Sequence, residues 1–211
     1  MSGTTGSASR PTDRRLVALV DAALAEAAVR AGPRLVCRPG CTACCLGPFP
    51  ISALDRERLR RGLAVLERTD PARADRVRAR ARDAVLRLTP GFPGDPATGI
   101  LGPDDAAEEA FCEAHAALPC PALDPELGTC DLYRWRPLSC RTFGPPARIG
   151  GEPLPPCSLC FVGASPDVVE ACRVAFDPDD LEGALLARLE AAGVSGETYV
   201  AFALAGRPAA P

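Results

Sequence analysis

Nine of the eleven cysteines in this 211-residue chain fall into three groups whose spacing suits metal chemistry. A C-x3-C-x2-C-C segment comes first, three cysteines at intervals of ten residues follow, and a C-x2-C pair comes last. Zn²⁺ takes four soft thiolates at tetrahedral corners, and iron–sulfur clusters use the same side chains. The sequence therefore predicts a Zn²⁺, iron or iron–sulfur centre. The candidate ligands are Cys37, Cys41, Cys44, Cys45, Cys120, Cys130, Cys140, Cys157 and Cys160.

The first group ends in two adjacent cysteines, Cys44 and Cys45. Adjacent side chains usually point in different directions, so one metal ion rarely takes both. A vicinal pair inside a cluster therefore indicates two neighbouring metals or a polynuclear centre. Two four-thiolate sites would use eight of the nine candidates, whereas one polynuclear iron centre would use fewer and leave free thiols for chemistry.

The other cysteines have competing interpretations. Cys112 and Cys172 stand alone within helical patterns, where a cysteine usually belongs to the core. Cys157 and Cys160 have the spacing of a redox dithiol, but such a dithiol normally opens a helix beside a βαβ unit. Prolines crowd the residues before this pair and no such unit is visible, so the sequence favours metal binding for it.

Composition places the chain among ordinary globular proteins, with 47% apolar and 24% charged residues. The net charge of −3 argues against a polycation that binds nucleic acid. The one apolar stretch near the N-terminus, residues 16–29, is broken by Asp21 and Glu26, which fits neither a secretory signal nor a membrane span. Many cysteines without an export signal indicate a reducing compartment. We therefore expect a cytoplasmic protein whose ligand is a metal ion, with neither a membrane nor nucleic acid as partner.

Other catalytic chemistry has little support in the sequence. His115 is the only histidine, and the commonest metal-hydrolase sites need two or three. We expect it to be a polar residue on the exposed side of an acidic helix. The chain has no G-x-S-x-G, P-loop or G-x-G-x-x-G motif, so hydrolase, NTPase and dinucleotide-binding functions are not supported. These observations leave open whether the protein is an enzyme.

The helical region 55–87 carries eleven arginines against six acidic residues. Such a surface suits phosphate or an acidic protein partner. No aromatic residues interleave with the arginines, which weakens a single-strand-binding interpretation. We expect a solvated helical face with ion pairs between neighbouring turns.

The elements that must position the cysteines are mostly helices. Apolar residues at helical spacing, with capping residues and Gly or Pro stops, predict a mostly α fold around two irregular cysteine-rich segments and one small β-hairpin. One domain is expected over residues 13–205, between a disordered N-terminal tail at 1–12 and a C-terminal tail at 206–211. The predicted helices span residues 13–31, 52–68, 71–88, 104–118, 167–176, 179–192 and 197–205, and the hairpin lies around 129–143.

The cysteine segments resemble a known family. Cys37 begins C-R-P-G-C-T-A-C-C, Phe49 begins F-P-I-S, Cys120 begins C-P-A-L, Gly128 begins G-T-C-D-L-Y and Arg136 begins R-P-L-S-C-R. In this order the pieces resemble the signature of the CxxCxxCC zinc- or iron-chelating family, the YkgJ-like cysteine-cluster proteins. The resemblance spans roughly residues 37–160, and its first gap has three residues where the family pattern has two.

The resemblance implies metal binding, and we expect the metal to close the two irregular segments on each other. The sulfurs of residues 37–45 and 120–140 should converge, because the first segment alone directs about three thiolates at one ion. Arg136 and Arg141 flank the second segment and should neutralise an anionic thiolate cluster. The aromatic residues nearby should pack over the metal region; they are Tyr133, Trp135 and Phe143.

Two other functions stay open beside a chelating domain. The family is also similar to part of the flagellin lysine N-methylases, which implies an iron–sulfur enzyme or electron carrier that acts on a protein substrate. Alternatively, the protein is a metal-handling chaperone that passes its ion to a protein partner.

Overall fold

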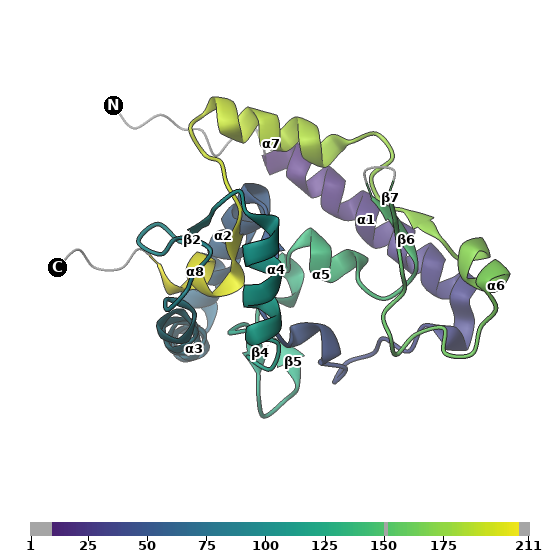
Figure 1. Cartoon of the computed structure of the whole chain (residues 1–211), viewed down its shortest axis with the longest axis horizontal. Helices are drawn as coiled ribbons and strands as arrows, with labels where there is room; N and C mark the ends of the chain where they lie inside the picture. The colour runs from purple at the N-terminus through teal and green to yellow at the C-terminus, as the bar shows by residue number, and fades with distance from the viewer. Residues whose placement is uncertain (1–9, 150–151, 207–211) are drawn as a thin grey trace. The chain divides into compact units, whose positions relative to one another are not determined.

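The computed structural model of this chain describes residues 10–149 and 152–206 (Figure 1). Eight α-helices lie within these two ranges, joined by short strands and 3₁₀ turns, so the predicted mostly α fold is confirmed. Residues 1–9 and 207–211, which make up most of the two predicted tails, lie outside the described residues.

The chain divides into two compact units, each built from two stretches of sequence. We call Pro39–Pro137 with Ser195–Pro211 the central unit, because most of it is the middle of the sequence. The flanking unit consists of Met1–Arg38 with Leu138–Val194. The single domain expected over residues 13–205 stays a prediction.

Helices α2 (Ala53–Thr69) and α3 (Pro71–Leu88) of the central unit follow each other with one residue between them. Ser52 caps α2, where its hydroxyl accepts a hydrogen bond from a first-turn amide at 3.3 Å. Asp70 caps α3 in the same way at 3.0 Å, and Pro71 takes the first helical position, where a missing N–H costs nothing. These local signals explain why both helices begin where the sequence predicts.

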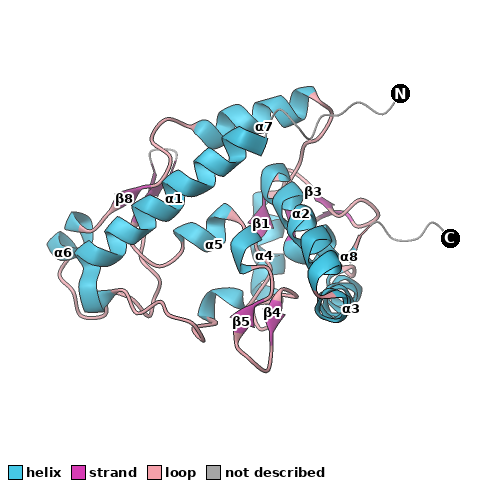
Figure 2. Ribbon diagram, turned by 180° about the vertical axis from the view of Figure 1, so that it is seen from behind, coloured by secondary structure: helices cyan, strands magenta, loops and turns pink. Residues whose placement is uncertain are grey.

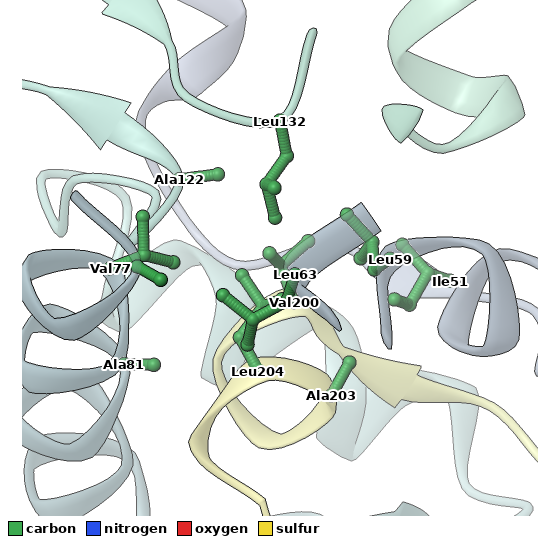
Figure 3. Close-up of a cluster of buried hydrophobic side chains, with 11 residues drawn as sticks. Ile51, Leu59, Leu63, Val77, Ala81, Ala122, Leu132, Val200, Ala203 and Leu204 are labelled. Carbon is green, nitrogen blue, oxygen red and sulfur yellow. The ribbon is translucent and has the colours of Figure 1, made fainter. Parts of the chain in front are cut away.

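The core of the central unit lies between α2, α3 and α8 (Val200–Ala205). Figure 3 shows Leu63, Val200 and Leu204 at its middle, with Ala122 and Leu132 reaching it from the cysteine-bearing segment. The apolar stripe predicted on α3 is buried along its length, at no more than 5% exposure. This stripe consists of Ala74, Val77, Ala81, Ala84 and Leu88. The same core therefore packs the helices and holds the segment around the second cysteine group.

Three antiparallel two-stranded ladders are present in the described part of the central unit. They pair β1 (Pro50–Ile51) with β9 (Thr198–Tyr199), β2 (Gly94–Asp95) with β3 (Ile100–Leu101), and β4 (Leu123–Asp124) with β5 (Thr129–Cys130).

The β4–β5 hairpin lies earlier in the chain than predicted (Figure 2). The hairpin expected around residues 129–143 is wrong, since a 3₁₀ turn (Tyr133–Trp135) and helix α5 (Leu138–Thr142) follow β5. The Asp124 carboxylate accepts hydrogen bonds from two following amides at 2.9 and 3.0 Å, and Gly128 takes a positive φ of 62°. These local bonds close a tight turn before Cys130.

Helices α1 (Arg10–Ala31) and α7 (Leu181–Ala191) of the flanking unit lie side by side in Figures 1 and 2. Leu16, Val20 and Ala27 of the predicted α1 stripe are at most 1% exposed. The rest of the unit consists of α5, α6 (Pro166–Ala171) and a small sheet of order β7-β6-β8, with strands Ala147–Ile149 (β6), Glu152–Leu154 (β7) and Val174–Ala175 (β8).

Four helices are shorter than predicted. Helix α7 spans Leu181–Ala191 instead of residues 179–192. Helix α4 spans Asp105–Ala114 instead of reaching residue 118, and His115 caps its end. Helix α6 ends at Ala171 instead of residue 176, because Val174–Ala175 pairs with β6. Helix α8 begins at Val200 instead of residue 197, because the two residues before it pair with β1. In the described ranges, no helix combines the length and the apolar character that crossing a bilayer requires.

Candidate metal centre

Two stretches of the central unit that are distant in sequence run side by side at Cys45 and Cys120. The amide of Cys120 donates to the carbonyl of Cys45 at 2.8 Å. The amide of Gly47 donates to the carbonyl of Leu118, also at 2.8 Å. Leu46 and Pro119 form an antiparallel bridge between these two bonds. The backbone itself therefore brings the first cysteine group to the second.

Cys130 and Cys44 complete this arrangement. The hairpin places Cys130 opposite Leu123, whose amide closes a turn on the Cys120 carbonyl at 2.9 Å. Cys44 lies on the 3₁₀ turn Ala43–Cys45, and its side chain is hydrogen-bonded to that of Cys45. We call Cys44, Cys45, Cys120 and Cys130 the four-thiol cluster.

The members of the four-thiol cluster shift one another's ionisation. Cys45 donates its S–H to Cys44, which lowers the pKa of the Cys44 thiol to about 6 and raises the pKa of Cys45. Burial raises the pKa of Cys120 to about 12 and also raises the pKa of Cys130. Negative charge on the other three thiols raises the pKa of Cys45 further. Ionising all four thiols is thus unfavourable without a cation, and a soft metal ion supplies that charge.

Arg136 and Arg73 are nearby positive charges, and Arg73 acts on Cys130. Arg136 lowers the pKa of both Cys44 and Cys130 through its charge, though in neither case as the largest cause. Its guanidinium lies 3.9 Å from the centre of the Tyr133 ring and donates to the Tyr133 carbonyl at 3.0 Å, which fixes its position. Arg141, which we expected to act in the same way, instead forms an ion pair at 2.7 Å with Asp21 of α1 in the flanking unit.

Cys41 belongs to the loop before the 3₁₀ turn. This loop packs on the β4–β5 turn, because a Cβ added at Gly128 would lie 3.7 Å from the Gly40 Cα and 3.8 Å from the Thr42 Cγ2. Over the described ranges, no three His, Cys, Asp or Glu side chains are arranged around one point as metal ligands. The thiols of the four-thiol cluster are close to one another, but their side chains must move before they can bind one ion.

The remaining candidate ligands, Cys37, Cys140, Cys157 and Cys160, belong to the flanking unit. The C-x3-C spacing of the first group is thus divided between the units after Arg38. The structure brings residues 44 and 45 together with residues 120 and 130. Convergence with Cys37 and Cys140 stays a prediction. None of the eleven cysteines, all of which lie in the described ranges, forms a disulfide.

The residues assigned to packing are found in packed environments. Cys172 is buried beside Ala31 and Phe161, and the Cys112 sulfur lies 3.5 Å from the Tyr199 hydroxyl. His115 is half-buried rather than exposed, because its ring packs on Phe111 at 4.3 Å and its Nδ1 lies 2.9 Å from the Phe111 carbonyl oxygen.

The aromatic residues expected to cover the metal region behave differently from one another. Tyr133 and Phe143 are 61% and 52% exposed, so neither covers a buried site. Trp135 packs against the core of the central unit beside Gly62 of α2. A Cβ on Gly62 would lie 2.3 Å from the Trp135 Cγ, so the glycine makes room for the indole.

An ion-pair network that the sequence analysis missed holds the segment between Cys130 and Leu132. The Asp131 side chain is fully buried and accepts hydrogen bonds from the Arg73 Nε and the Arg80 Nη2, both at 2.5 Å. Arg80 also donates to the Pro121 carbonyl at 2.9 Å, next to Cys120. The sequence contains a signal for this network. Asp131 lies between two apolar residues, and Arg73 and Arg80 are seven residues apart, which places them on one face of the predicted helix. We call these three residues the Asp131 clamp.

The predicted solvated arginine face is therefore wrong for part of α2 and α3. Besides the clamp, Arg58 is 2% exposed and pairs with Asp55, which is buried as well. Arg78 pairs with Glu67 between the two helices. Buried charges need partners of this kind, and these arginines serve the fold rather than an external ligand.

Comparison with known proteins gives one match. The family model CxxCxxCC, described as "Putative zinc- or iron-chelating domain", matches residues 36–158, which is more than half of the chain. No curated protein and no solved structure matches. The matched region contains every member of the four-thiol cluster.

Proposed function

Because the chain belongs to the CxxCxxCC family, we propose that its central unit binds a zinc or iron ion through the four-thiol cluster, Cys44, Cys45, Cys120 and Cys130. Metal binding in general is supported by the family, whereas the ligand set and the metal are our proposal. One observation carries it: thiols from three separate segments lie close enough for their charges to shift one another's pKa values.

The donor set fits a soft ion. Thiolates favour zinc, iron and iron–sulfur clusters over hard cations such as Mg²⁺ and Ca²⁺. Arg136 offsets part of the negative charge that four thiolates leave on a divalent ion. Cys41, from the loop on the same hairpin, is the candidate that replaces Cys45 where one ion takes only one of the vicinal pair.

We favour zinc, as a structural ion. Zinc held by four thiolates has no redox chemistry and no bound water to activate. Its contribution is to link the residue 44–45 turn with the segment around Cys120 and Cys130. In small zinc modules such binding supplies about 10–16 kcal/mol of apparent folding free energy.

An iron–sulfur centre is the second candidate, and the adjacency of Cys44 and Cys45 favours it, because a polynuclear centre has several metal atoms to bind them. An enzyme or electron carrier with a protein substrate, similar to the flagellin lysine N-methylases, belongs with this candidate. A metal-handling chaperone and the YkgJ-like subfamily stay further hypotheses. Eleven cysteines without a disulfide support a reducing, cytoplasmic location for all of these functions.

Anaerobic purification of the full chain, followed by elemental analysis, visible spectroscopy and X-ray absorption, tests the metal. Zinc in a colourless sample with four sulfur ligands is the expected result. A brown sample with acid-labile sulfide would overturn the zinc assignment in favour of an iron–sulfur centre.

Substitution tests the ligands. Cys44→Ser should lose metal, because a hydroxyl is a hard and poor replacement for a thiolate. Cys112→Ser and Cys172→Ser are the matched controls and should retain the full metal content. Equal loss in all three variants would contradict the assignment of the ligands.

A further inference from the structure

We propose that the flanking unit carries a second thiolate site for a soft divalent cation, formed by Cys37, Cys157 and Cys160 with Cys140 as the fourth ligand. This inference goes beyond the proposed function, because the four-thiol cluster contributes no residue to it.

The C-x2-C pair lies on a tight turn rather than on a helix. The amide of Cys160 donates to the carbonyl of Cys157 at 2.8 Å, which folds the four residues into one turn. The next helix begins only at Pro166, so neither thiol lies at a helix N-terminus. A redox dithiol normally opens a helix, which this pair does not, whereas a turn of this kind directs two sulfurs to one side.

A strained residue fixes the end of this turn. Phe161 has a φ of 57°, a left-handed conformation that is unfavourable for a bulky residue. Its amide donates to the Arg34 carbonyl at 2.9 Å, and its carbonyl accepts from the Ala164 amide at 3.0 Å. The chain therefore turns back immediately after Cys160 and is held against the segment that leads to Cys37.

Gly144 brings Cys37 to the pair. Its carbonyl accepts a hydrogen bond from the Cys157 amide at 3.0 Å. A Cβ added at Gly144 would lie 3.0 Å from the Cys37 sulfur, so this sulfur lies directly over the glycine. Cys37 and Cys157 thus contact the same residue from two distant parts of the sequence.

Cys140 is the fourth cysteine of the flanking unit that is not assigned to packing. Cys140 lies on α5, four residues before Gly144, and is half-buried. Cys160 is 4% exposed in an apolar cluster with Phe161, whereas Cys37 is exposed, so an ion bound there would be shielded from water on the Cys160 side. As in the central unit, the side chains within the described ranges are not arranged around one point, so binding requires them to move.

The test is a titration of the metal-free full chain with Co²⁺ and Zn²⁺, read by thiolate charge-transfer absorbance and by metal stoichiometry. The wild-type protein should bind two ions. Cys157→Ala should bind one and keep the site in the central unit, and Cys130→Ala should bind one and keep the site in the flanking unit. The double variant should bind none. Cys172→Ala, which removes a buried thiol of the same cluster, should still bind two.

Three outcomes would overturn the second site. The first is that Cys157→Ala still binds two ions and its thiolate absorbance is unchanged. Another is a single ion in the wild type whose binding either single substitution abolishes, since this indicates one shared centre. The third is loss of an ion from Cys172→Ala in a variant whose circular dichroism is unchanged. If Cys130→Ala keeps two ions while Cys157→Ala loses one, the proposed function of the central unit fails and the second site stands.

Discussion

Replacing Asp131 by Asn tests whether a buried charge positions the second cysteine group. The substitution keeps the shape of the side chain but removes the charge that Arg73 and Arg80 share. Removing one partner of a fully buried ion pair costs about 3–5 kcal/mol. The two arginine side chains are 33% and 24% exposed, so water compensates part of this loss. We expect the free energy of unfolding of the metal-free protein to fall by about 2–3 kcal/mol.

The substitution should also weaken metal binding. Asp131 lies between Cys130 and the core residue Leu132, so its clamp limits how far β5 moves relative to Cys120. A looser hairpin must be ordered when the ion binds. We expect the zinc dissociation constant, measured by competition with a chromophoric chelator, to rise about tenfold, as loss of an outer partner typically causes.

Urea denaturation of the metal-free protein is the assay for stability, and Asp75→Asn is the matched control. Asp75 is an exposed aspartate on α3, and its substitution should change the free energy of unfolding by less than about 0.5 kcal/mol. Because the Asp131 carboxylate is buried, its effect should persist in 0.5 M salt, roughly the range where surface pairs are screened. Equal stability of Asp131→Asn and Asp75→Asn would refute the reasoning. A double-mutant cycle with Arg73→Gln should give a coupling energy of about 1 kcal/mol or more.

Three further predictions concern other parts of the central unit. Gly62→Ala should lower the free energy of unfolding by about 1–3 kcal/mol, because the added methyl group would collide with Trp135. In most helices the same substitution raises stability. Thermal denaturation measures the effect, and an unchanged or raised melting temperature would contradict it. Zinc binding to the four-thiol cluster, measured in Cys157→Ala so that only this site is loaded, should release about three protons at pH 7. The reason is that Cys44 has a lowered pKa, whereas Cys45, Cys120 and Cys130 have raised ones, so the affinity should rise with pH. Calorimetry in buffers of different ionisation enthalpy counts the protons, and pH-independent affinity would be inconsistent with these pKa directions. Ser52→Ala should cost about 1 kcal/mol in urea denaturation through loss of the α2 cap, and Ser52→Thr should restore most of it.

Local signals made part of this fold predictable. Ser52 and Asp70 are capping residues followed by amphipathic stretches, and both helices begin after them. The stripe of α3 is buried because its spacing matches the helical period. Strands β8 and β9 were not predictable. Thr198–Tyr199 pairs with Pro50–Ile51, and Val174–Ala175 pairs with β6, in both cases a segment distant in sequence. A two-residue strand carries no pattern that identifies a partner so far away.

The candidate site was predictable in its residue types but not in its division. Cysteine spacing predicted thiolate ligands, which stays a prediction, whereas Cys37 and Cys41, only four residues apart, belong to different compact units. That division depends on backbone contacts of Arg34 and Gly144 with the distant segment 157–161. The Asp131 clamp was missed for a related reason, because an arginine-rich helix is usually solvated, and only the packed hairpin shows which arginines turn inward.

The position of α8 in the core of the central unit has a consequence for biosynthesis. Leu204 is fully buried against the helices and the hairpin segment, yet it is made long after Cys45. At about 5–20 residues per second, the ribosome needs on the order of 10–30 s to synthesise the chain between them. During that time the nascent central unit lacks part of its core. Folding of this unit is therefore completed only after α8 leaves the ribosome.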